Sequence, residues 1–303
     1  MALEAGVRIA VIGVDGFIGG AVFRALVSTG MRPSPLGRPR SDRDRAEQSS
    51  LIESLDYVIF AAGGITPALA AEQPRRVEEE LVALDHVLQA SKRGGRNPRV
   101  VLISSGGAVY APHSRPPFSE SSPVHATSAY GAVKLEQERM LLQAEDFIVP
   151  VILRVANVYG PGQAIRGSLG VVAHWLDAVA RGNRPQMIGD PLTRRDYIYV
   201  DDVVDAILRV VRTRPDMRAV FNIGSGKPTS LAELKVTIEA VVGHGLEVTQ
   251  LPARAFDRGD VWLDVAVAEA VLGWRPATAL RSGIARFWTW RQRQPAKPCE
   301  ERD

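Results

Sequence analysis

The sequence predicts an α/β fold in which a doubly wound parallel sheet is joined to a smaller C-terminal lobe. A β-rich run at the N-terminus enters a glycine-rich turn and then a helical pattern, and strands alternate with helices as far as about residue 155. That alternation is typical of a parallel sheet covered on both faces. Turn-rich segments follow. We therefore assign residues 1–155 to the sheet domain, 156–290 mainly to the lobe, with some segments returning to the sheet, and 291–303 to a polar tail.

The composition is that of an ordinary globular protein. The chain has 303 residues, of which 46% are hydrophobic and 23% charged, and its net charge is +3. This small, dispersed charge does not indicate nucleic-acid binding. A single cysteine, Cys299, excludes an intrachain disulfide framework and a cysteine-based zinc site, so we expect no metal. No apolar run reaches the roughly 18 residues of a membrane span, and the N-terminus lacks a signal pattern. We expect a soluble, cytoplasmic protein.

The first strand, residues 7–12, leads into a turn with the spacing GxxGxxG. Such a turn lets the backbone approach a pyrophosphate, while the following helix offers free N–H groups and the positive end of its dipole. The alternative is a turn that only connects the strand to the helix and binds no ligand. The candidate cofactor-binding residues of this turn are Gly13, Gly16, Phe17, Ile18 and Gly19.

The end of the second strand bears on the choice of cofactor. An acidic residue there would accept hydrogen bonds from the ribose of NAD, whereas an arginine would pair with the 2′-phosphate of NADP. The chain offers Gly37 and Arg38, which favours NADP over NAD, although Arg38 also suits a surface position or stacking on adenine. The next strand ends in small residues, where a cofactor could pass closely, and Ala62 is the candidate there.

The stretch from Ser128 to Lys134 carries the main chemical signal. Tyr130 and Lys134 are four residues apart, so on a helix they share one face. An ammonium beside a tyrosine favours the phenolate, which lets the phenol exchange a proton near neutral pH. Thr127 and Ser128 are capping types and apolar residues follow, so we predict a helix. The same spacing also occurs on ordinary amphipathic helices, and the pair becomes specific only with the rest of the chain.

Six segments occur in one order: the glycine turn, residues 104–110, 130–134, 153–162, 195–202 and 272–276. With them the chain resembles the extended short-chain dehydrogenase/reductases. Within these it looks most like the NAD(P)-dependent nucleotide-sugar epimerase/dehydratase family, of the UDP-galactose 4-epimerase type. The resemblance spans nearly the whole chain, and it implies a Rossmann-type sheet with a substrate-binding lobe.

The resemblance implies roles for these residues. Tyr130 would exchange a proton with a sugar hydroxyl while hydride moves between the sugar and the nicotinamide, and Lys134 would bond the nicotinamide ribose. Asn157, Arg195 and Arg254 match positions that hold the diphosphate of a UDP- or dTDP-linked sugar. The alternative for the two arginines is a surface ion pair with an aspartate. The family also implies a homodimer.

The chain departs from the family pattern at three places. The catalytic hydroxyl of the family falls on Gly106, and Ser105 is the nearest replacement, although a shift of one residue on a strand turns a side chain to the other face. Glu80 stands where a helix asparagine is usual. Gly107 and Ala108 replace the acidic pair of the dehydratases, which disfavours a 4,6-dehydratase.

Three functions remain open at this point. The first is a 4-epimerase that oxidises C4 of the sugar transiently and returns the hydride to the other face. The second is an NADPH-dependent reductase of nucleotide 4-keto sugars, which Gly37 and Arg38 favour. The third is a catalytically silent NADP-binding sensor, which the missing hydroxyl at Gly106 favours and which intact Tyr130 and Lys134 oppose.

Overall fold

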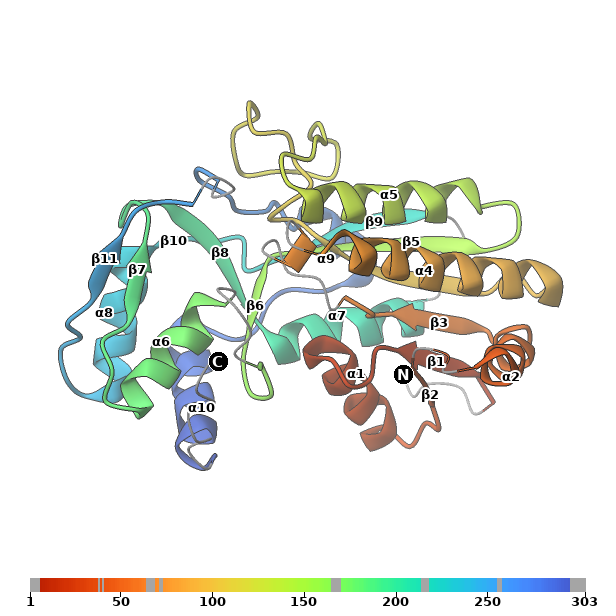
Figure 1. Cartoon of the computed structure of the whole chain (residues 1–303), viewed down its shortest axis with the longest axis horizontal. Coiled ribbons are helices and arrows are strands. Elements are labelled where there is room, and N and C mark those ends of the chain that lie inside the picture. The colour runs from red at the N-terminus through yellow and green to blue at the C-terminus, as the bar shows by residue number, and fades with distance from the viewer. Residues whose placement is uncertain are drawn as a thin grey trace.

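The computed structural model describes residues 6–37, 39, 41–63, 69–70, 73–164, 170–213, 218–254 and 258–294. These residues form a six-stranded parallel sheet with helices on both faces, and a smaller lobe at one end of it (Figure 1). The predicted α/β fold with a doubly wound sheet is confirmed. No helix in the described ranges is long and apolar enough to cross a membrane.

The strands of the main sheet follow each other in space in an order that changes direction once. From edge to edge they are β2 (Ser34–Leu36), β1 (Ile9–Ile12), β3 (Tyr57–Phe60), β4 (Arg99–Ser105), β5 (Val149–Val155) and β9 (Ala219–Ile223). The chain runs outward from β1 to β2 on one side and to β3 on the other. Because ligands of open parallel sheets bind at the carboxyl ends of strands beside such a reversal, the fold directs attention to the ends of β1 and β3.

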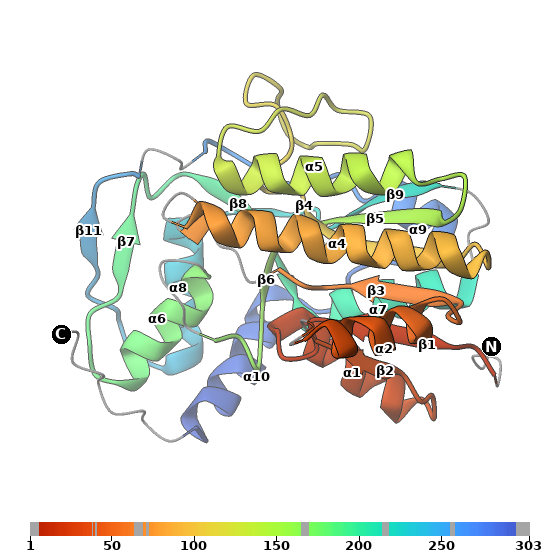
Figure 2. The ribbon, with the colours of Figure 1, turned by 45° about the vertical axis from the view of Figure 1, so that its right-hand side comes forward.

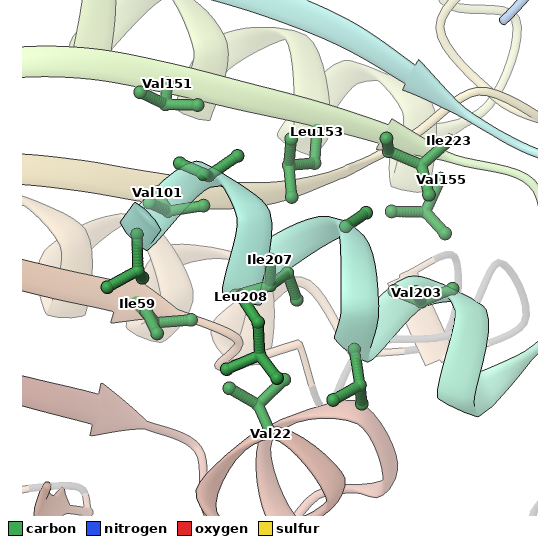
Figure 3. Close-up of a cluster of buried hydrophobic side chains, with 14 of the residues drawn as sticks. Val22, Ile59, Val101, Val151, Leu153, Val155, Val203, Ile207, Leu208 and Ile223 are labelled. Carbon is green, nitrogen blue, oxygen red and sulfur yellow. The ribbon is translucent and has the colours of Figure 1, made fainter. Parts of the chain in front are cut away.

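One face of the sheet is covered by α1 (Phe17–Ser28), α7 (Val200–Thr213) and α9 (Ala266–Leu272). Figure 3 shows Leu208 of α7 beside Val22 of α1, with Ile59 and Val101 of the sheet nearby. These side chains are buried, and each one removed from water contributes about 1.5–3 kcal/mol. The strands are buried on both faces, which explains why they appear in the sequence as almost continuous apolar runs.

The opposite face is covered by α2 (Asp42–Ile52), α4 (Pro74–Gly94) and α5 (Ala129–Gln143). α4 and α5 lie side by side over this face in both views (Figure 2). Residues of even number in β4, such as Val100 and Leu102, pack against these helices, whereas Val101 packs on the other side. This alternation decides which residues at the end of β4 meet α5.

The smaller lobe is built on two short sheets and three helices. Its elements are β6 (Asn157–Tyr159), β8 (Arg194–Tyr199), β10 (Pro228–Ser230), β7 (Gln186–Ile188), β11 (Thr249–Leu251), α6 (Val171–Ala180), α8 (Leu231–Val242) and α10 (Leu280–Gln292). A capping box opens α8: the Ser230 side chain accepts from the Glu233 backbone, and the Glu233 side chain accepts from the Ser230 backbone. The chain enters the lobe after β5 and returns to the main sheet as β9, so the lobe is attached at the carboxyl edge of the sheet.

Candidate active site

The turn between β1 and α1 brings three backbone segments close together. Gly13 has a φ of +89°, and a Cβ on it would lie 2.7 Å from the carbonyl oxygen of Ala61. The N–H of Gly16 donates to the carbonyl oxygen of Gly13 at 2.9 Å, and a Cβ on Gly19 would overlap that same oxygen. The glycines therefore allow α1 and the end of β3 to pack on the turn. No side chain caps the N-terminus of α1.

Two further candidate cofactor-binding residues begin α1 at this turn. Phe17 and Ile18 are its first two residues, and both are half-buried. The ring of Phe17 comes within 4.0 Å of where a Cβ on Gly162 would lie, so the lobe reaches the glycine turn. Arg38 lies outside the described residues, and the preference for NADP that it carries therefore stays a prediction.

The end of β3 lies beside the candidate lysine. Ala62 and Gly63 follow this strand, and Ala62 is half-buried. A Cβ on Gly63 would lie 3.6 Å from Nζ of Lys134. The ammonium is therefore placed at the carboxyl end of the strand next to β1, where the fold directs a ligand.

Tyr130 and Lys134 lie together on the first turns of α5. Ser128 caps this helix, since its Oγ accepts from the N–H of Gly131 at 3.1 Å. Nζ of Lys134 is 5.9 Å from the centre of the Tyr130 ring. Lys134 is 4% exposed, and its ammonium donates to Oε1 of Gln137 at 3.0 Å and to the carbonyl oxygen of Ile103 at 3.4 Å. Tyr130 is half-buried.

The end of β4 supplies a hydroxyl at Ser105, and Gly106 after it supplies none. The carbonyl oxygen of Ser105 accepts from Ala108 and Val109, so the chain leaves the sheet there and the alternation of the strand ends. Ser105 Oγ lies 3.9 Å from where a Cβ on Gly107 would be. The hydroxyl of Ser105 makes no hydrogen bond within the described residues. Its role as a replacement hydroxyl stays a prediction.

Asn157 and Arg195 are held by neighbouring strands of the lobe. Asn157 of β6 donates through Nδ2 to the backbone oxygen of Asp196 in β8 at 2.8 Å. Arg195 donates to the backbone oxygens of Arg258 and Gly259, each at 2.6 Å. The structure thus places Arg195 in a fork of backbone carbonyls.

Asp196 of β8 binds two loops next to Arg195. Its carboxylate accepts from the backbone and hydroxyl of Ser225 at 2.7 and 2.6 Å, from Gly226 at 3.1 Å and from Leu263 at 3.3 Å. Burial raises the pKa of Asp196 above its ordinary value in spite of these bonds. The carboxylate ties β8 to two loops, which fixes the backbone that carries Arg195.

Arg258 is a site residue that the sequence reasoning missed. It is half-buried, and its Nη1 donates to the carbonyl oxygen of Gly107 at 3.2 Å, beside Ser105. Burial and the charge of Arg195 lower the pKa of its guanidinium. Arg258 has no carboxylate partner within the described ranges, and the charge of Arg195 is close enough to act on it. Arg254, the arginine that we predicted, is half-buried just before residues 255–257, which are outside the described ranges.

The residues present fit a dinucleotide. The glycine turn holds the N-terminus of α1 close against the ends of β1 and β3, and no side chain caps that N-terminus, so its free N–H groups suit a pyrophosphate. From there the carboxyl edge of the sheet leads past Ala62 and Gly63 to Lys134 and Tyr130. Pyrophosphate cradle, small strand ends and a phenol–ammonium pair therefore lie along one edge.

Comparisons with known proteins agree with this arrangement. The model of the NAD dependent epimerase/dehydratase family matches residues 9–224. UDP-glucose 4-epimerase of Mycolicibacterium smegmatis is 33% identical over 306 residues, covering 92% of this chain and 96% of that protein. dTDP-6-deoxy-L-talose 4-dehydrogenase (NAD(P)(+)) of Kitasatospora kifunensis is 31% identical, with 95% and 96% covered. The crystal structure of UDP-glucose 4-epimerase from Thermotoga maritima with UDP-glucose has a TM-score of 0.86 and 28% identity, covering 94% of this chain and 98% of that one.

The matched region contains the glycine turn, the Tyr130 helix and the strands that join them. The resemblance inferred from the six sequence segments is thereby confirmed. The chain belongs to the NAD-dependent epimerase/dehydratase family.

Proposed function

We propose that this protein is a nucleotide-sugar 4-epimerase in which Tyr130 is the acid and base. The observation that carries the proposal is the position of the Tyr130–Lys134 pair, whose ammonium lies next to Gly63 at the carboxyl edge of the sheet. A tyrosine that is ionised beside an ammonium can accept the proton of a sugar hydroxyl, and the phenol so formed can return it. The family membership and the epimerases among the similar proteins support the same reaction.

Each residue of the site has its own role in cofactor binding or proton transfer in this proposal. NAD, when bound, supplies the chemistry that takes a hydride from C4 of the sugar and gives it back to the other face. Gly13, Gly16 and Gly19 would hold its pyrophosphate. Lys134 would exchange its bond to Gln137 for one to the nicotinamide ribose. Tyr130 would remove the proton from the C4 hydroxyl.

Other groups would hold the substrate. Ser105 would donate a hydrogen bond to the sugar oxygen that Tyr130 deprotonates. Arg195, Asn157 and Arg258 lie close enough together to hold a diphosphate, since Arg195 bonds the backbone of Arg258 and Asn157 bonds the strand residue that follows Arg195. We assign Arg254 to the same anion. The substrate is then a UDP- or dTDP-linked sugar.

A reductase of nucleotide 4-keto sugars is the second candidate. Its support is the similarity to a dTDP-sugar 4-dehydrogenase that uses NAD(P)(+), together with Gly37 and Arg38 in the sequence. The same tyrosine would then give a proton to the C4 oxygen in a single direction, and each turnover would consume reduced cofactor.

One experiment separates these functions. The purified protein is analysed for its bound dinucleotide, which decides between NAD and NADP, and is then incubated with UDP-glucose, UDP-N-acetylglucosamine and dTDP-4-keto-6-deoxyglucose, each with and without NADPH. Interconversion of C4 epimers without net change of cofactor supports the epimerase. NADPH oxidation with the keto sugar alone overturns it in favour of the reductase. Dinucleotide binding with no turnover in any arm favours the sensor.

Two substitutions test the assigned roles. Tyr130→Phe should abolish turnover while the dinucleotide stays bound, and full turnover in this variant would refute the role of Tyr130. Ser105→Ala should lower kcat about tenfold or more, as loss of one positioned donor in a proton transfer does. An unchanged kcat in Ser105→Ala would show that Ser105 does not replace the hydroxyl missing at Gly106.

A further inference from the structure

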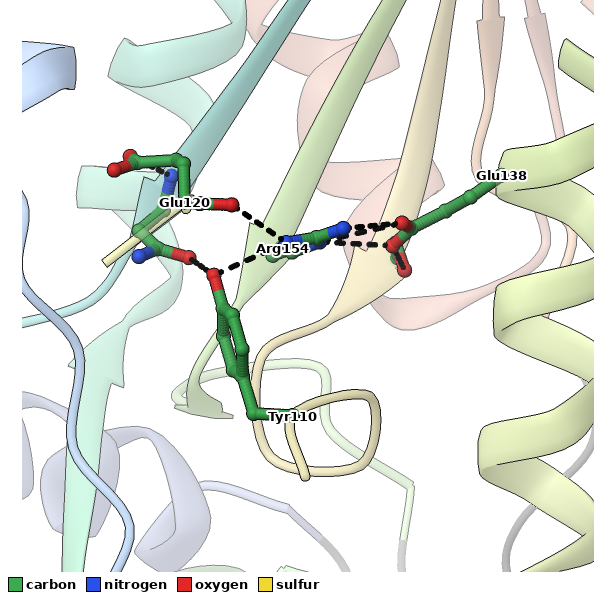
Figure 4. Close-up of polar contacts among 6 residues, drawn as sticks. Tyr110, Glu120, Glu138 and Arg154 are labelled. Atoms are coloured by element: carbon green, nitrogen blue, oxygen red, sulfur yellow. Dashed lines mark hydrogen bonds and ion pairs between the residues drawn. The ribbon is translucent and has the colours of Figure 1, made fainter. Parts of the chain in front are cut away.

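A buried ion pair joins α5 to the sheet. Arg154 of β5 is 7% exposed and Glu138 of α5 is 4% exposed. Nη2 of Arg154 donates to Oε2 of Glu138 at 2.7 Å, and Nε donates to Oε1 at 3.1 Å (Figure 4). Such a forked contact fixes the orientation of the two side chains as well as their distance.

The other side of the guanidinium reaches the chain that follows β4. Nη1 of Arg154 donates to the hydroxyl of Tyr110 and to the backbone oxygen of Glu120, each at 3.4 Å. The Tyr110 hydroxyl donates in turn to Oδ1 of Asn222 in β9 at 2.5 Å. Burial raises the pKa of the Tyr110 hydroxyl, so it remains a neutral donor. Tyr110 and Asn222 are fully buried, and the network therefore runs through the interior.

Glu138 also receives a bond from β4. Oγ of Ser104 donates to Oε1 of Glu138 at 2.5 Å. Ser104 comes directly before Ser105, and Glu138 follows Lys134 by four residues, as Lys134 follows Tyr130. These three residues of α5 therefore share one face of the helix. One carboxylate contacts both the strand end next to Ser105 and the helix face of Tyr130 and Lys134.

We propose that the Glu138–Arg154 pair is a positioning unit. It holds the helix that carries Tyr130 and the strand end that carries Ser105 in a fixed relative position facing the substrate. The inference rests on the proposed function, because the relation that it fixes is the one between the phenol of Tyr130 and the hydroxyl of Ser105. Neither Glu138 nor Arg154 touches the substrate in this assignment.

Stability alone does not account for this pair. A buried ion pair is seldom more stable than well-packed apolar side chains of similar size, because both charges lose their hydration. Apolar contacts of this helix, such as those of Leu141 with the sheet, lack direction, and the bond from Lys134 to the carbonyl oxygen of Ile103 is long at 3.4 Å. A fork that meets strand, loop and helix at once supplies the direction that apolar packing lacks. A displacement of about 1 Å between reacting groups can lower a rate roughly 100-fold.

Two variants remove the fork in different ways. Glu138→Gln keeps the shape of the side chain and an oxygen for Ser104, but it removes the charge. Arg154→Lys keeps the positive charge, but its single nitrogen cannot reproduce the fork to Glu138 while it also reaches Tyr110 and the Glu120 carbonyl on the other side. The control is Glu136→Gln, which breaks an exposed ion pair with Arg139 on the same helix.

Three quantities are measured on the full chain with NAD bound: kcat, KM for the sugar nucleotide, and hydrogen exchange of residues 104–110 and 129–137. We expect kcat to fall roughly 10- to 100-fold in both variants, with KM and the NAD dissociation constant within about twofold of the wild type. Exchange should rise in both segments together. Glu136→Gln should leave all of these values unchanged.

Several results would overturn the proposal. These are an unchanged kcat in Arg154→Lys, a loss that appears only as a smaller folded fraction with normal kcat per folded molecule, and faster exchange in one segment alone. If Glu138→Gln does not fold, the kcat, KM and hydrogen exchange of Arg154→Lys alone test the proposal. If the wild type turns over none of the sugars, the proposed function fails while the exchange arm still tests whether the pair couples the two segments.

Discussion

Leu263 occupies the space that a side chain at position 106 would need. A Cβ on Gly106 would lie 2.7 Å from Cδ1 and 2.9 Å from Cδ2 of Leu263, and 3.2 Å from the backbone oxygen of Arg154. Leu263 is 1% exposed and packs against Tyr110 and Phe118. The missing hydroxyl at Gly106 is thus matched by a leucine from the far end of the chain, and the site is built around a glycine.

The first prediction concerns this pair of residues. Gly106→Ala should lower the free energy of unfolding by about 1–3 kcal/mol, because an added methyl group in a filled core forces its neighbours apart. Leu263→Ala alone should cost about 2–5 kcal/mol through the cavity that it leaves. In the double variant the new methyl group enters that cavity, so the loss of stability of the double variant should be at least about 1 kcal/mol smaller than the sum of the two single losses. Chemical denaturation measures all three.

A neighbouring glycine provides the control. A Cβ on Gly107 would have Ser105 Oγ as its nearest neighbour, at 3.9 Å, so Gly107→Ala should cost less than Gly106→Ala. Strict additivity of Gly106→Ala and Leu263→Ala would show that Leu263 does not determine the residue at position 106.

The sequence was sufficient for the elements that depend on local signals. The Ser128 cap and the spacing of Tyr130 and Lys134 predicted the start of α5 and its chemical face, and the apolar runs predicted the buried strands. These features follow from residues that are close in the chain, where capping and periodicity act.

The features that the sequence did not predict depend on contacts between distant segments. No residue near Gly106 in the sequence predicts that Leu263 covers it, because the two residues are far apart in the chain and meet only in the folded structure. Arg258 likewise becomes a half-buried cation only through Gly107 and Arg195. Arg154 is a charged residue at the end of an apolar run, and such a residue is a local sign of a buried partner.

The second prediction concerns the lysine in the absence of cofactor. Gln137 is fully buried and accepts from Nζ of Lys134, so Gln137→Leu leaves that buried ammonium with one acceptor fewer. We expect the free protein to lose about 1–3 kcal/mol of stability. If Lys134 bonds the nicotinamide ribose as proposed, the cofactor supplies a new acceptor, and saturating NAD should raise Tm more in this variant than in the wild type.

The control is Gln143→Leu, an exposed position on the same helix. Its shift of Tm with NAD should equal that of the wild type in differential scanning calorimetry. Equal NAD shifts in Gln137→Leu and the wild type would mean that Lys134 does not change partners when the cofactor binds.

The third prediction concerns Arg258. Its half-buried guanidinium lies near Arg195, and burial together with that neighbouring charge lowers its pKa. A bound diphosphate would relieve this repulsion. Arg258→Met should therefore weaken UDP binding roughly 10- to 100-fold, which corresponds to the 1.5–3 kcal/mol of a hydrogen bond to a charged group. Titration calorimetry with UDP measures the change.

Arg184 serves as a comparison, because it forms an exposed ion pair with Glu247 in the same lobe. Arg184→Met should leave UDP affinity unchanged, and both variants should bind NAD like the wild type. Wild-type UDP affinity in Arg258→Met would remove Arg258 from the anion site.

The last prediction concerns Glu120, whose side chain accepts from the backbone N–H of Asn222 at 2.7 Å. Burial raises the pKa of its carboxyl above the ordinary value of 4.5, and nearby Asp264 adds to this while Arg154 opposes it. The folded state therefore holds this proton more tightly than the unfolded chain. Its contribution to stability is present below pH 4.5 and is lost as the pH rises through the folded pKa.

Glu120→Gln removes this titration and keeps an oxygen for Asn222. The free energy of unfolding of the wild type minus that of the variant should thus be largest near pH 4 and should fall toward pH 7, since only the wild type must bury a charge as the carboxyl ionises. Urea denaturation of both proteins across this range gives the difference. A difference that stays constant, or that grows with pH, would mean that the carboxyl ionises as readily in the folded protein as in the unfolded chain, and that burial beside Asp264 does not govern it.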